Sequence, residues 1–236
     1  MGHLKGKTAI ITGGGRAVLK DGSCGSIGYG IATAYAKEGA NLVITGRNMQ
    51  KLLDAKEELE RLYGVQVLPV QADVAAGADN EAVVQNVIDQ AIEKFGEIHV
   101  LINNAQASAS GVSIADHTSE QFDLAIYSGL YATFHYMQAC YPYLAKAKGS
   151  VINFASGAGL FGNYGQCAYA AAKEGIRGLT LANAMQLSSW TGKTVELPFD
   201  EELYYNELMK RVATSRRKTN VVAQIADTAG TFAGTK

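Results

Sequence analysis

The sequence predicts an α/β fold with a doubly wound parallel sheet. Three observations point to it: five short β-rich runs, helical periodicities that alternate with them over the first two-thirds of the chain, and a glycine-rich loop after the first run. Strand and helix in strict alternation give a parallel sheet, and right-handed crossovers place helices on both of its faces.

The expected strands are short and rich in β-branched residues, as buried parallel strands usually are. They are Thr8–Thr12, Asn41–Thr45, Gln66–Val70, His99–Asn103 and Ser150–Phe154. Because every strand of a parallel sheet ends at the same edge, the loops that follow these runs are expected to meet there.

Between the strands, apolar residues recur with the period of an amphipathic helix. One pattern comprises Leu52, Leu53, Leu59, Leu62 and Tyr63, and another comprises Val84, Val87, Ile88, Ala91, Ile92 and Phe95. A first helix is expected to begin near Ile27, and longer helices are expected at about 120–146 and 167–187. Gly39 and Gly64 are placed where helices should end.

Size and charge exclude several classes of protein. The chain has 236 residues, of which 47% are hydrophobic, which suffices for a large buried core. Its 21 basic and 22 acidic residues give a net charge of −1, and this balance argues against a nucleic-acid or anionic-membrane partner. No apolar run approaches the roughly 18–20 residues that cross a bilayer.

The cysteines and histidines indicate neither disulfides nor a metal site. Cys24, Cys140 and Cys167 are odd in number and widely spaced, which favours a reducing, cytoplasmic location. The four histidines show no ligand spacing, so we expect no metal.

A glycine-rich loop joins the first strand to the first helix. It begins Thr12-Gly13-Gly14-Gly15 and ends Gly25-Ser26-Ile27-Gly28. Glycines there let the backbone approach a pyrophosphate, while the helix N-terminus supplies N–H donors and positive potential. In this position the loop predicts a Rossmann-type dinucleotide site.

Arg47 points to the choice of dinucleotide. An NAD site usually places Asp or Glu after the second strand, against the ribose 2′-hydroxyl. This chain instead has Gly46 followed by Arg47. Because a guanidinium matches a 2′-phosphate, NADP(H) is favoured over NAD(H).

A tyrosine, a lysine and a serine suit acid–base chemistry. Tyr169 and Lys173 lie four apart, on one face of an expected helix, and Ser156 ends the fifth strand thirteen residues before Tyr169. A free phenol titrates near pH 10, and a nearby ammonium favours the phenolate that could exchange a proton with an alcohol. A serine hydroxyl can hold the substrate oxygen.

Over about residues 5–180 these features together resemble the short-chain dehydrogenase/reductase family. The glycine loop resembles T-G-x-x-x-G-x-G, with about eight extra residues from Arg16 to Ser23 and with Ser26 at the middle glycine. Asn103-Asn104-Ala105 resembles the family's N-N-A-G, and Tyr169-x-x-x-Lys173 its catalytic pair. Asp73-Val74 matches the pair that contacts adenine in the family.

The resemblance implies roles for these residues. Tyr169 would be the general acid and base, Ser156 would orient the carbonyl or alcohol, and Lys173 would tune Tyr169 and bind the nicotinamide ribose. The implied cofactor-binding residues are Gly13, Ser26, Ile27, Arg47, Asp73, Val74, Asn103, Ala105, Tyr169 and Lys173. The residues expected to line the substrate space are Gln106, Ser108, Phe161 and Tyr164.

Two residues depart from the family's pattern. Gly129 stands where the family carries a catalytic asparagine that positions a water leading from the lysine to solvent, and Gln106 replaces the last glycine of N-N-A-G. Ser128 could substitute for the asparagine, although adjacent helical residues point about 100° apart. We therefore expect a weakened or rerouted proton relay.

The pattern changes after about residue 181. Residues 1–180 are expected to form the dinucleotide-binding and catalytic domain, and residues 181–236 an atypical segment packed on it. Residues 182–235 resemble the C-terminal end of glucose–fructose oxidoreductase and inositol dehydrogenase-type enzymes, through Leu197-Pro198-Phe199-Asp200-Glu201, Tyr204-Tyr205 and Arg211–Ser215. Val195–Pro198 could stand in for the family's missing late strand.

Three functional hypotheses follow. The first is a cytoplasmic oxidoreductase that transfers hydride between a nicotinamide and a secondary alcohol or ketone. Because its long helices resemble those that form the subunit interface in the family, the resemblance implies a homodimer or homotetramer. The second is an enoyl (C=C) reductase, suggested by Ser26-Ile27-Gly28-Tyr29. The third is a dinucleotide-binding protein with impaired catalysis, suggested by Gly129, Gln106 and the atypical tail.

Overall fold

The computed structural model of the chain describes residues 2–191, 206 and 209–210. Its compact units are Met1–Ala182 and Asn183–Lys236, and the fold below is that of the first. The expectations for Val195–Pro198 and for most of the tail resemblance lie outside the described residues. No helix in the described part of the chain is both long enough and apolar enough to cross a membrane.

Five parallel strands form one sheet. They are β1 (Thr8–Thr12), β2 (Asn41–Gly46), β3 (Val67–Gln71), β4 (Val100–Asn103) and β5 (Ser150–Asn153). Their order is β3-β2-β1-β4-β5, so the winding reverses between β1 and β4. The predicted doubly wound parallel sheet is confirmed, with strand ends shifted by one residue.

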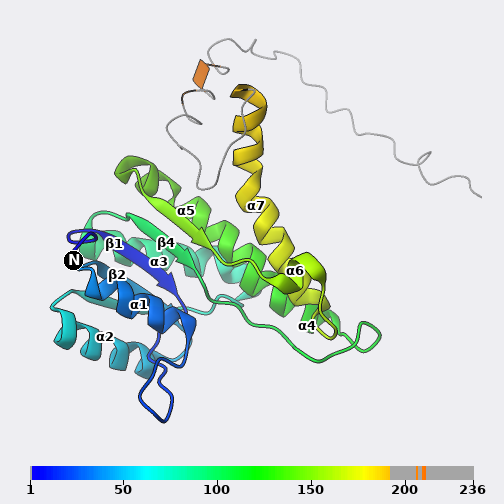
Figure 1. The fold of residues 1–236 in the computed structure, drawn as a ribbon, viewed down its shortest axis with the longest axis horizontal. Helices are drawn as coiled ribbons and strands as arrows, with labels where there is room; N and C mark the ends of the chain where they lie inside the picture. Colours follow the sequence, from blue (N-terminus) through cyan, green and yellow to red (C-terminus); the bar gives the residue numbers. More distant parts are fainter. Residues whose placement is uncertain (1, 192–205, 207–208, 211–236) are drawn as a thin grey trace, which may run out of the picture. The chain divides into compact units, whose positions relative to one another are not determined.

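The helices cover both faces of the sheet (Figure 1). One face carries α1 (Ile27–Lys37) and α2 (Met49–Tyr63), and the other carries α3 (Asn80–Phe95) and α5 (Ala132–Ala147). The remaining helical elements are η1 (Gly77–Asp79), α4 (Ser119–Ala125), η2 (Ile126–Tyr131), α6 (Gly157–Phe161) and α7 (Cys167–Thr191).

The strands are apolar on both sides because helices cover both faces. Along β1, Ile11 packs toward α1 and α2, while Ile10 packs toward α3 and α5. This alternation is the period-2 geometry of a strand. On the helices, the predicted face of α3 is buried, whereas Leu53 and Leu62 of α2 are exposed, so the buried stripe of α2 is narrower than its pattern suggested.

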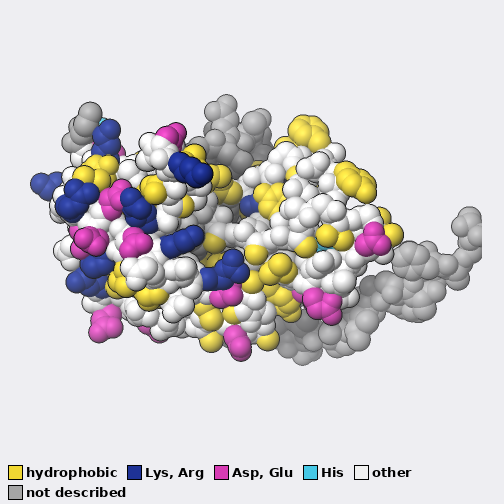
Figure 2. All heavy atoms as spheres, turned by 90° about the horizontal axis from the view of Figure 1, so that it is seen from below, with side chains coloured by type: hydrophobic (Ala, Val, Ile, Leu, Met, Phe, Trp, Pro, Cys, Tyr) yellow, Lys and Arg dark blue, Asp and Glu magenta, His cyan; other side chains and the backbone are white. Residues whose placement is uncertain are grey.

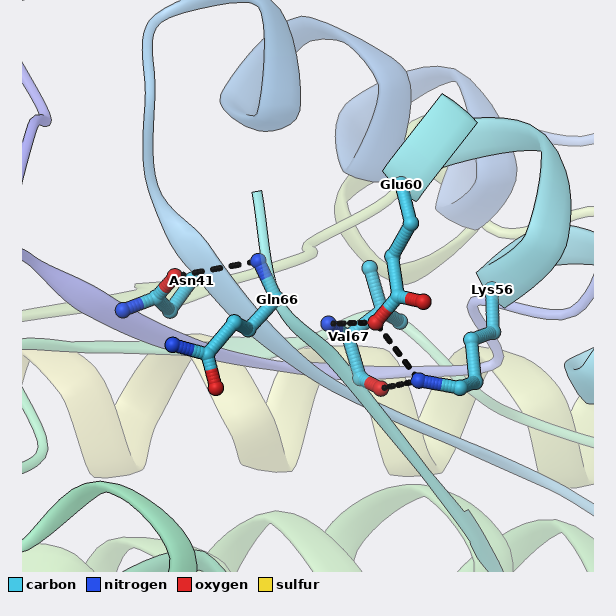
Figure 3. A network of polar contacts seen from close by, with 5 residues as sticks. All are labelled: Asn41, Lys56, Glu60, Gln66 and Val67. Carbon is cyan, nitrogen blue, oxygen red and sulfur yellow. Dashed lines mark hydrogen bonds and ion pairs between the residues drawn. The ribbon is translucent and has the colours of Figure 1, made fainter. Parts of the chain in front are cut away.

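A polar network fixes the passage from α2 into β3 (Figure 3). Helix α2 ends at Gly64, whose φ of 67° is left-handed, as expected for a glycine cap. Oε1 of Glu60 then accepts from the backbone N–H of Val67 at 2.9 Å, and Nζ of Lys56 donates to the Val67 carbonyl at 3.0 Å. The first residue of the edge strand β3 is thus held through both its backbone N–H and its backbone carbonyl.

His99 joins three strands just before β4. Its Nδ1 accepts from the backbone N–H of Thr8 at 3.1 Å, so the imidazole is neutral at that atom. Its own backbone N–H donates to the Thr8 carbonyl, and its carbonyl accepts from the N–H of Ser150. Burial lowers the pKa of His99, and the nearby Lys7 lowers it further, although Glu97 at 3.4 Å from Nε2 acts in the opposite direction.

This histidine should make stability depend on pH. With a folded pKa below the unfolded value of about 6.5, the unfolded chain binds the proton more readily, so stability falls as pH drops below about 6.5. Urea unfolding of His99→Gln, which keeps a neutral side chain, should show a smaller loss between about pH 7 and 5. His3→Gln, at an exposed position, is the control. Parallel curves for wild type and His99→Gln would contradict the assignment.

Candidate functional site

The glycine loop brings β1 and α1 into direct contact at the carboxyl edge of the sheet. Gly13 has a φ of +73°, and a Cβ on Gly28 would lie 2.1 Å from the Gly13 carbonyl oxygen. Only glycine fits at position 28, because the nearest atom, the Gly13 carbonyl oxygen, belongs to the backbone. The first turn of α1 therefore lies against the end of β1, at the carboxyl edge of the sheet.

Thr12 and Asn104 tie this loop to the end of β4. The Thr12 hydroxyl accepts from the backbone N–H groups of Asn104 and Ala105, both at 2.9 Å. In return, the Asn104 side chain donates to the Thr12 carbonyl at 2.9 Å. Sequence reasoning assigned neither side chain a role, although Thr12-Gly13 and Asn104-Ala105 lie within its two motifs.

The inserted residues Arg16 to Ser23 form a short side loop that takes no part in the contact between Gly13 and Gly28. Val18 and Cys24 form an antiparallel bridge, and the N–H of Gly25 returns to the Ala17 carbonyl at 2.7 Å. The first residue of the insertion, Arg16, is anchored to α2 by an ion pair with Glu58. The loop thus accommodates the extra residues without displacing Gly13 from Gly28.

A cavity of about 280 Å³ opens where β1 to β4 end, at the point where the winding reverses. Its lining residues are Gly13, Thr45, Gly46, Arg47, Ala72, Asp73, Val74, Asn104, Ala105, Gln106 and Ala107. Arg47 and Asp73 also line an adjoining cavity of about 270 Å³. Six of the predicted residues therefore line the first cavity, and Arg47 lines both cavities.

Three other predicted cofactor residues lie differently. Ser26 caps α1, its hydroxyl accepting from the N–H of Tyr29 at 3.4 Å, and Ile27 is 65% exposed at the start of that helix. Asn103 is buried, and its side chain donates to Asn153 at 2.8 Å across β4 and β5. Asn103 thus joins two strands, while its neighbours Asn104 and Ala105 face the cavity.

Tyr169, Lys173 and Ser156 come from α7 and from the end of β5. Nζ of Lys173 donates to the Phe154 carbonyl at 2.7 Å and lies 5.6 Å from the centroid of the Tyr169 ring. Burial lowers the pKa of Lys173 to about 8. Ser156 caps α6 by accepting from the N–H of Ala158 at 3.2 Å. The predicted pairing of Tyr169 with Lys173 is present in the structure.

The four residues expected to face the substrate differ in exposure. Phe161 and Tyr164 are 88% and 86% exposed, and Ser108 lies with its hydroxyl 3.5 Å from that of Ser110. Gln106 lines the cavity, but its amide atoms are buried. In Figure 2 charged side chains gather over the half with α1 and α2, while hydrophobic ones with fewer charges cover the half with α4 and α6.

Ser128 cannot take the place of a relay residue at position 129. It is fully buried, and its hydroxyl accepts from the N–H of Ala107 at 3.0 Å and lies 2.6 Å from the Leu124 carbonyl, to which it donates. These contacts leave it no free donor. The long helix expected over 120–146 is also interrupted here by the π-helical turn η2, which contains both Ser128 and Gly129.

Within the described residues, no group of three or more His, Cys, Asp or Glu side chains is placed to hold a metal ion. The cavity at the sheet edge is instead lined by one arginine, one aspartate and two carboxamides, while the Tyr–Lys pair lies on α7 and is bonded to the segment after β5. Such a set can bind anionic and amide groups and move a proton.

Comparison with known proteins places the chain among oxidoreductases. The family described as short chain dehydrogenase matches residues 7–196. A 12α-hydroxysteroid dehydrogenase from Clostridium sp. (strain ATCC 29733 / VPI C48-50) is 65% identical over 186 residues, which cover 79% of this chain and 69% of that protein.

Solved structures agree with this placement. The structure of NAD⁺-bound xylitol dehydrogenase is similar with a TM-score of 0.68 and 26% identity, covering 79% of this chain and 67% of that one. A short chain dehydrogenase from Mycobacterium smegmatis is similar with a TM-score of 0.69 and 29% identity, covering 79% and 73%.

The Thr12 hydroxyl should be needed for the stability of the sheet edge. Thr12→Val leaves two backbone N–H groups without their acceptor, so the free energy of unfolding should fall by about 1–3 kcal/mol. Urea unfolding measures the change. Thr33→Val is the matched control, because the Thr33 hydroxyl only donates to a carbonyl of its own helix, and the expected change is within about 0.5 kcal/mol. Equal effects of the two variants would contradict this role.

Proposed function

Because the chain belongs to the short-chain dehydrogenase family, we propose that it is an NADP-preferring hydroxysteroid oxidoreductase in which Tyr169 is the general acid and base. Membership of the family gives the reaction class, the NAD(P)-dependent interconversion of a secondary alcohol and a ketone. The contact of Lys173 with the Tyr169 ring is the observation that carries the role of Tyr169.

The residues at the sheet edge fit a dinucleotide. The close approach of Gly28 to Gly13 brings the first turn of α1 against the end of β1, where the N–H groups of that turn can donate to a phosphate. When bound there, the nicotinamide supplies the hydride acceptor or donor. Gly13, Asp73, Val74 and Ala105 would hold the dinucleotide, since they line the cavity.

Arg47 supports the preference for NADP(H). It lines both cavities, and the end of β2 has no acidic residue to accept a hydrogen bond from a ribose hydroxyl. Within the described part of the chain the Arg47 guanidinium forms no ion pair, so its donors can bind a 2′-phosphate. This choice is independent of the reaction class, which both cofactors serve.

The proposed substrate class is a hydroxysteroid, as in the 65% identical relative. A fused-ring alcohol is flat and mostly apolar, and it needs a surface of the same character. The exposed Phe161 and Tyr164 lie between Ser156 and Tyr169 in the sequence, and Leu160 beside them is 53% exposed. Those aromatic and aliphatic side chains can cover the ring system while Ser156 holds its oxygen.

The proton chemistry belongs to Tyr169 and Lys173. A phenol becomes a useful base only when its anion is stabilised, and the Lys173 ammonium next to the ring provides that charge. The bond from Lys173 to the Phe154 carbonyl fixes the ammonium without neutralising it. Ser156 lies at the end of β5, so its hydroxyl can hold the substrate oxygen within reach of the phenol.

We also propose that the protein is a homodimer or homotetramer in the cytoplasm. Tyr131, Phe134 and Tyr141 are 46%, 41% and 64% exposed along η2 and α5, which gives these helices an apolar outer surface. Such a surface is typical of an interface between subunits. The three cysteines are all free, as a reducing compartment would keep them.

Replacing Tyr169 should separate chemistry from binding. Tyr169→Phe removes the proton-transferring hydroxyl, so turnover of a 12-hydroxysteroid should fall by about 10²–10⁴-fold while NADPH fluorescence titration stays nearly unchanged. Tyr63→Phe, at the end of α2, is the matched control. Unchanged turnover in Tyr169→Phe would contradict the mechanism. Faster turnover of an enoyl thioester than of any ketone by the wild type would favour C=C reduction instead.

Replacing Arg47 should change the cofactor preference. Arg47→Ala removes charge-assisted bonds to the 2′-phosphate worth about 1.5–3 kcal/mol, so Kd for NADPH should rise about 10- to 100-fold. Kd for NADH should stay within about threefold, since NADH has no phosphate there. Fluorescence titration measures both, with Arg61→Ala of α2 as the control. A similar loss for both cofactors would contradict the preference.

A further inference from the structure

The side chain of Gln106 ends in a buried and unpartnered carboxamide. Its Oε1 and Nε2 are both shielded from solvent, and neither has a hydrogen-bond partner among the described residues. Leaving a buried amide unpaired is costly, by about 1–3 kcal/mol for each group. A buried donor and acceptor that lie at the edge of the cavity therefore call for a partner of their own, such as water.

Gln106 occupies the space into which a side chain at position 129 would project. A Cβ on Gly129 would lie 2.6 Å from Nε2, 2.8 Å from Cδ and 3.1 Å from Oε1 of Gln106. All three distances are shorter than ordinary contacts between heavy atoms. Any side chain at position 129 therefore competes with this carboxamide, and the space holds one polar group at a time.

The two backbones that meet here are fixed relative to each other. Ser128, which precedes Gly129 in η2, accepts from the N–H of Ala107, the residue that follows Gln106. Since η2 and the β4 loop are joined at neighbouring residues, a carboxamide can reach the same space from either side. The side chain at 106 reaches it from the loop, and one at 129 would reach it from the helix.

The loop that carries Gln106 follows β4, the strand that neighbours β5. Asn103 pairs with Asn153 at the ends of β4 and β5. Gln106 and Ser156 each lie three residues beyond that pair, and Lys173 is bonded to Phe154 between them. Gln106, the substrate-holding serine and the lysine's acceptor thus follow neighbouring strands at the carboxyl edge of the sheet.

Each turnover needs a route for one proton. When an alcohol is oxidised, a bound nicotinamide would take the hydride from its carbon, and the Tyr169 phenolate would take the proton of its hydroxyl. That proton must then reach solvent before the next turnover, and the buried Lys173 already uses one N–H on a carbonyl. A carboxamide can accept from one water and donate to another, so it can hold a water in such a route.

We propose, resting on the function proposed above, that Gln106 and Gly129 form an exchanged pair, in which Gln106 supplies from the β4 loop the polar group that position 129 lacks. Gln106 is then a positioning residue: it holds the water through which the proton leaves Tyr169 and Lys173. The weakened relay expected from Gly129 alone is thereby rerouted through the neighbouring loop.

The exchange can be tested by moving the carboxamide back to the helix. Gly129→Asn alone should lower the melting temperature by about 2–10 °C, since its Cβ meets Gln106. The double variant Gln106→Gly, Gly129→Asn should regain most of that loss. Melting is measured on the protein without cofactor, so this result does not depend on activity. Additive effects of the two substitutions on melting would overturn the exchange.

Kinetics then test the relay. Gln106→Leu keeps the volume but removes both polar atoms, so kcat should fall at least about tenfold with KM changed less than about threefold. The double variant Gln106→Gly, Gly129→Asn should have a higher kcat than either Gln106→Leu or Gly129→Asn. Gln90→Leu, on the surface of α3, is the control and should match wild type.

The outcomes separate this inference from the proposed function. An active wild type with an equally active Gln106→Leu overturns the relay role and leaves the proposed function intact. A folded double variant that binds NADPH but stays as slow as Gln106→Leu also overturns it. A wild type that binds NADPH yet turns over no secondary alcohol or ketone contradicts the proposed function, and the relay role is then overturned with it.

Discussion

The contact between Gly13 and Gly28 is the constraint on which the site depends. The helix α1 can begin against the end of β1 only because Gly28 carries no side chain, since a Cβ there would lie 2.1 Å from the Gly13 carbonyl oxygen. That contact sets where the helix N-terminus opens. Thr12 and Asn104 then bring the end of β4 to the same point, so that the cavity forms where the winding of the sheet reverses.

Local patterns in the sequence were enough to predict the layers and most of the cavity. Strands and helices bury residues at periods of 2 and 3.6, and the loops after parallel strands must meet at one edge, so Gly13, Arg47, Asp73 and Ala105 could be placed together without coordinates. The sequence could also indicate the pairing of Tyr169 with Lys173, since a spacing of four residues on a helix is a local property.

Features that depend on contacts between distant segments could not be predicted in this way. The turn η2 interrupts an otherwise regular helix, and Ser128 within it is bonded to Ala107, 21 residues away. Asn103 appeared to be a cofactor residue from its motif, yet its side chain is directed to Asn153, 50 residues away. In both cases the side-chain chemistry was clear from the sequence, and only the partner was unknown.

The same distinction explains why Gly129 and Gln106 look like two separate defects in the sequence. Taken alone, Gly129 removes a polar side chain from the helix, and Gln106 fills space beside the β4 loop that the family's glycine leaves open. In the folded chain the two positions share one space, and the buried carboxamide fills the volume that the glycine leaves. A proton relay needs a polar group at a point in space and not at a point in the sequence, so either backbone can supply it. The pair therefore has to be judged as one unit, since substituting either member alone leaves that space overfilled or without its polar group.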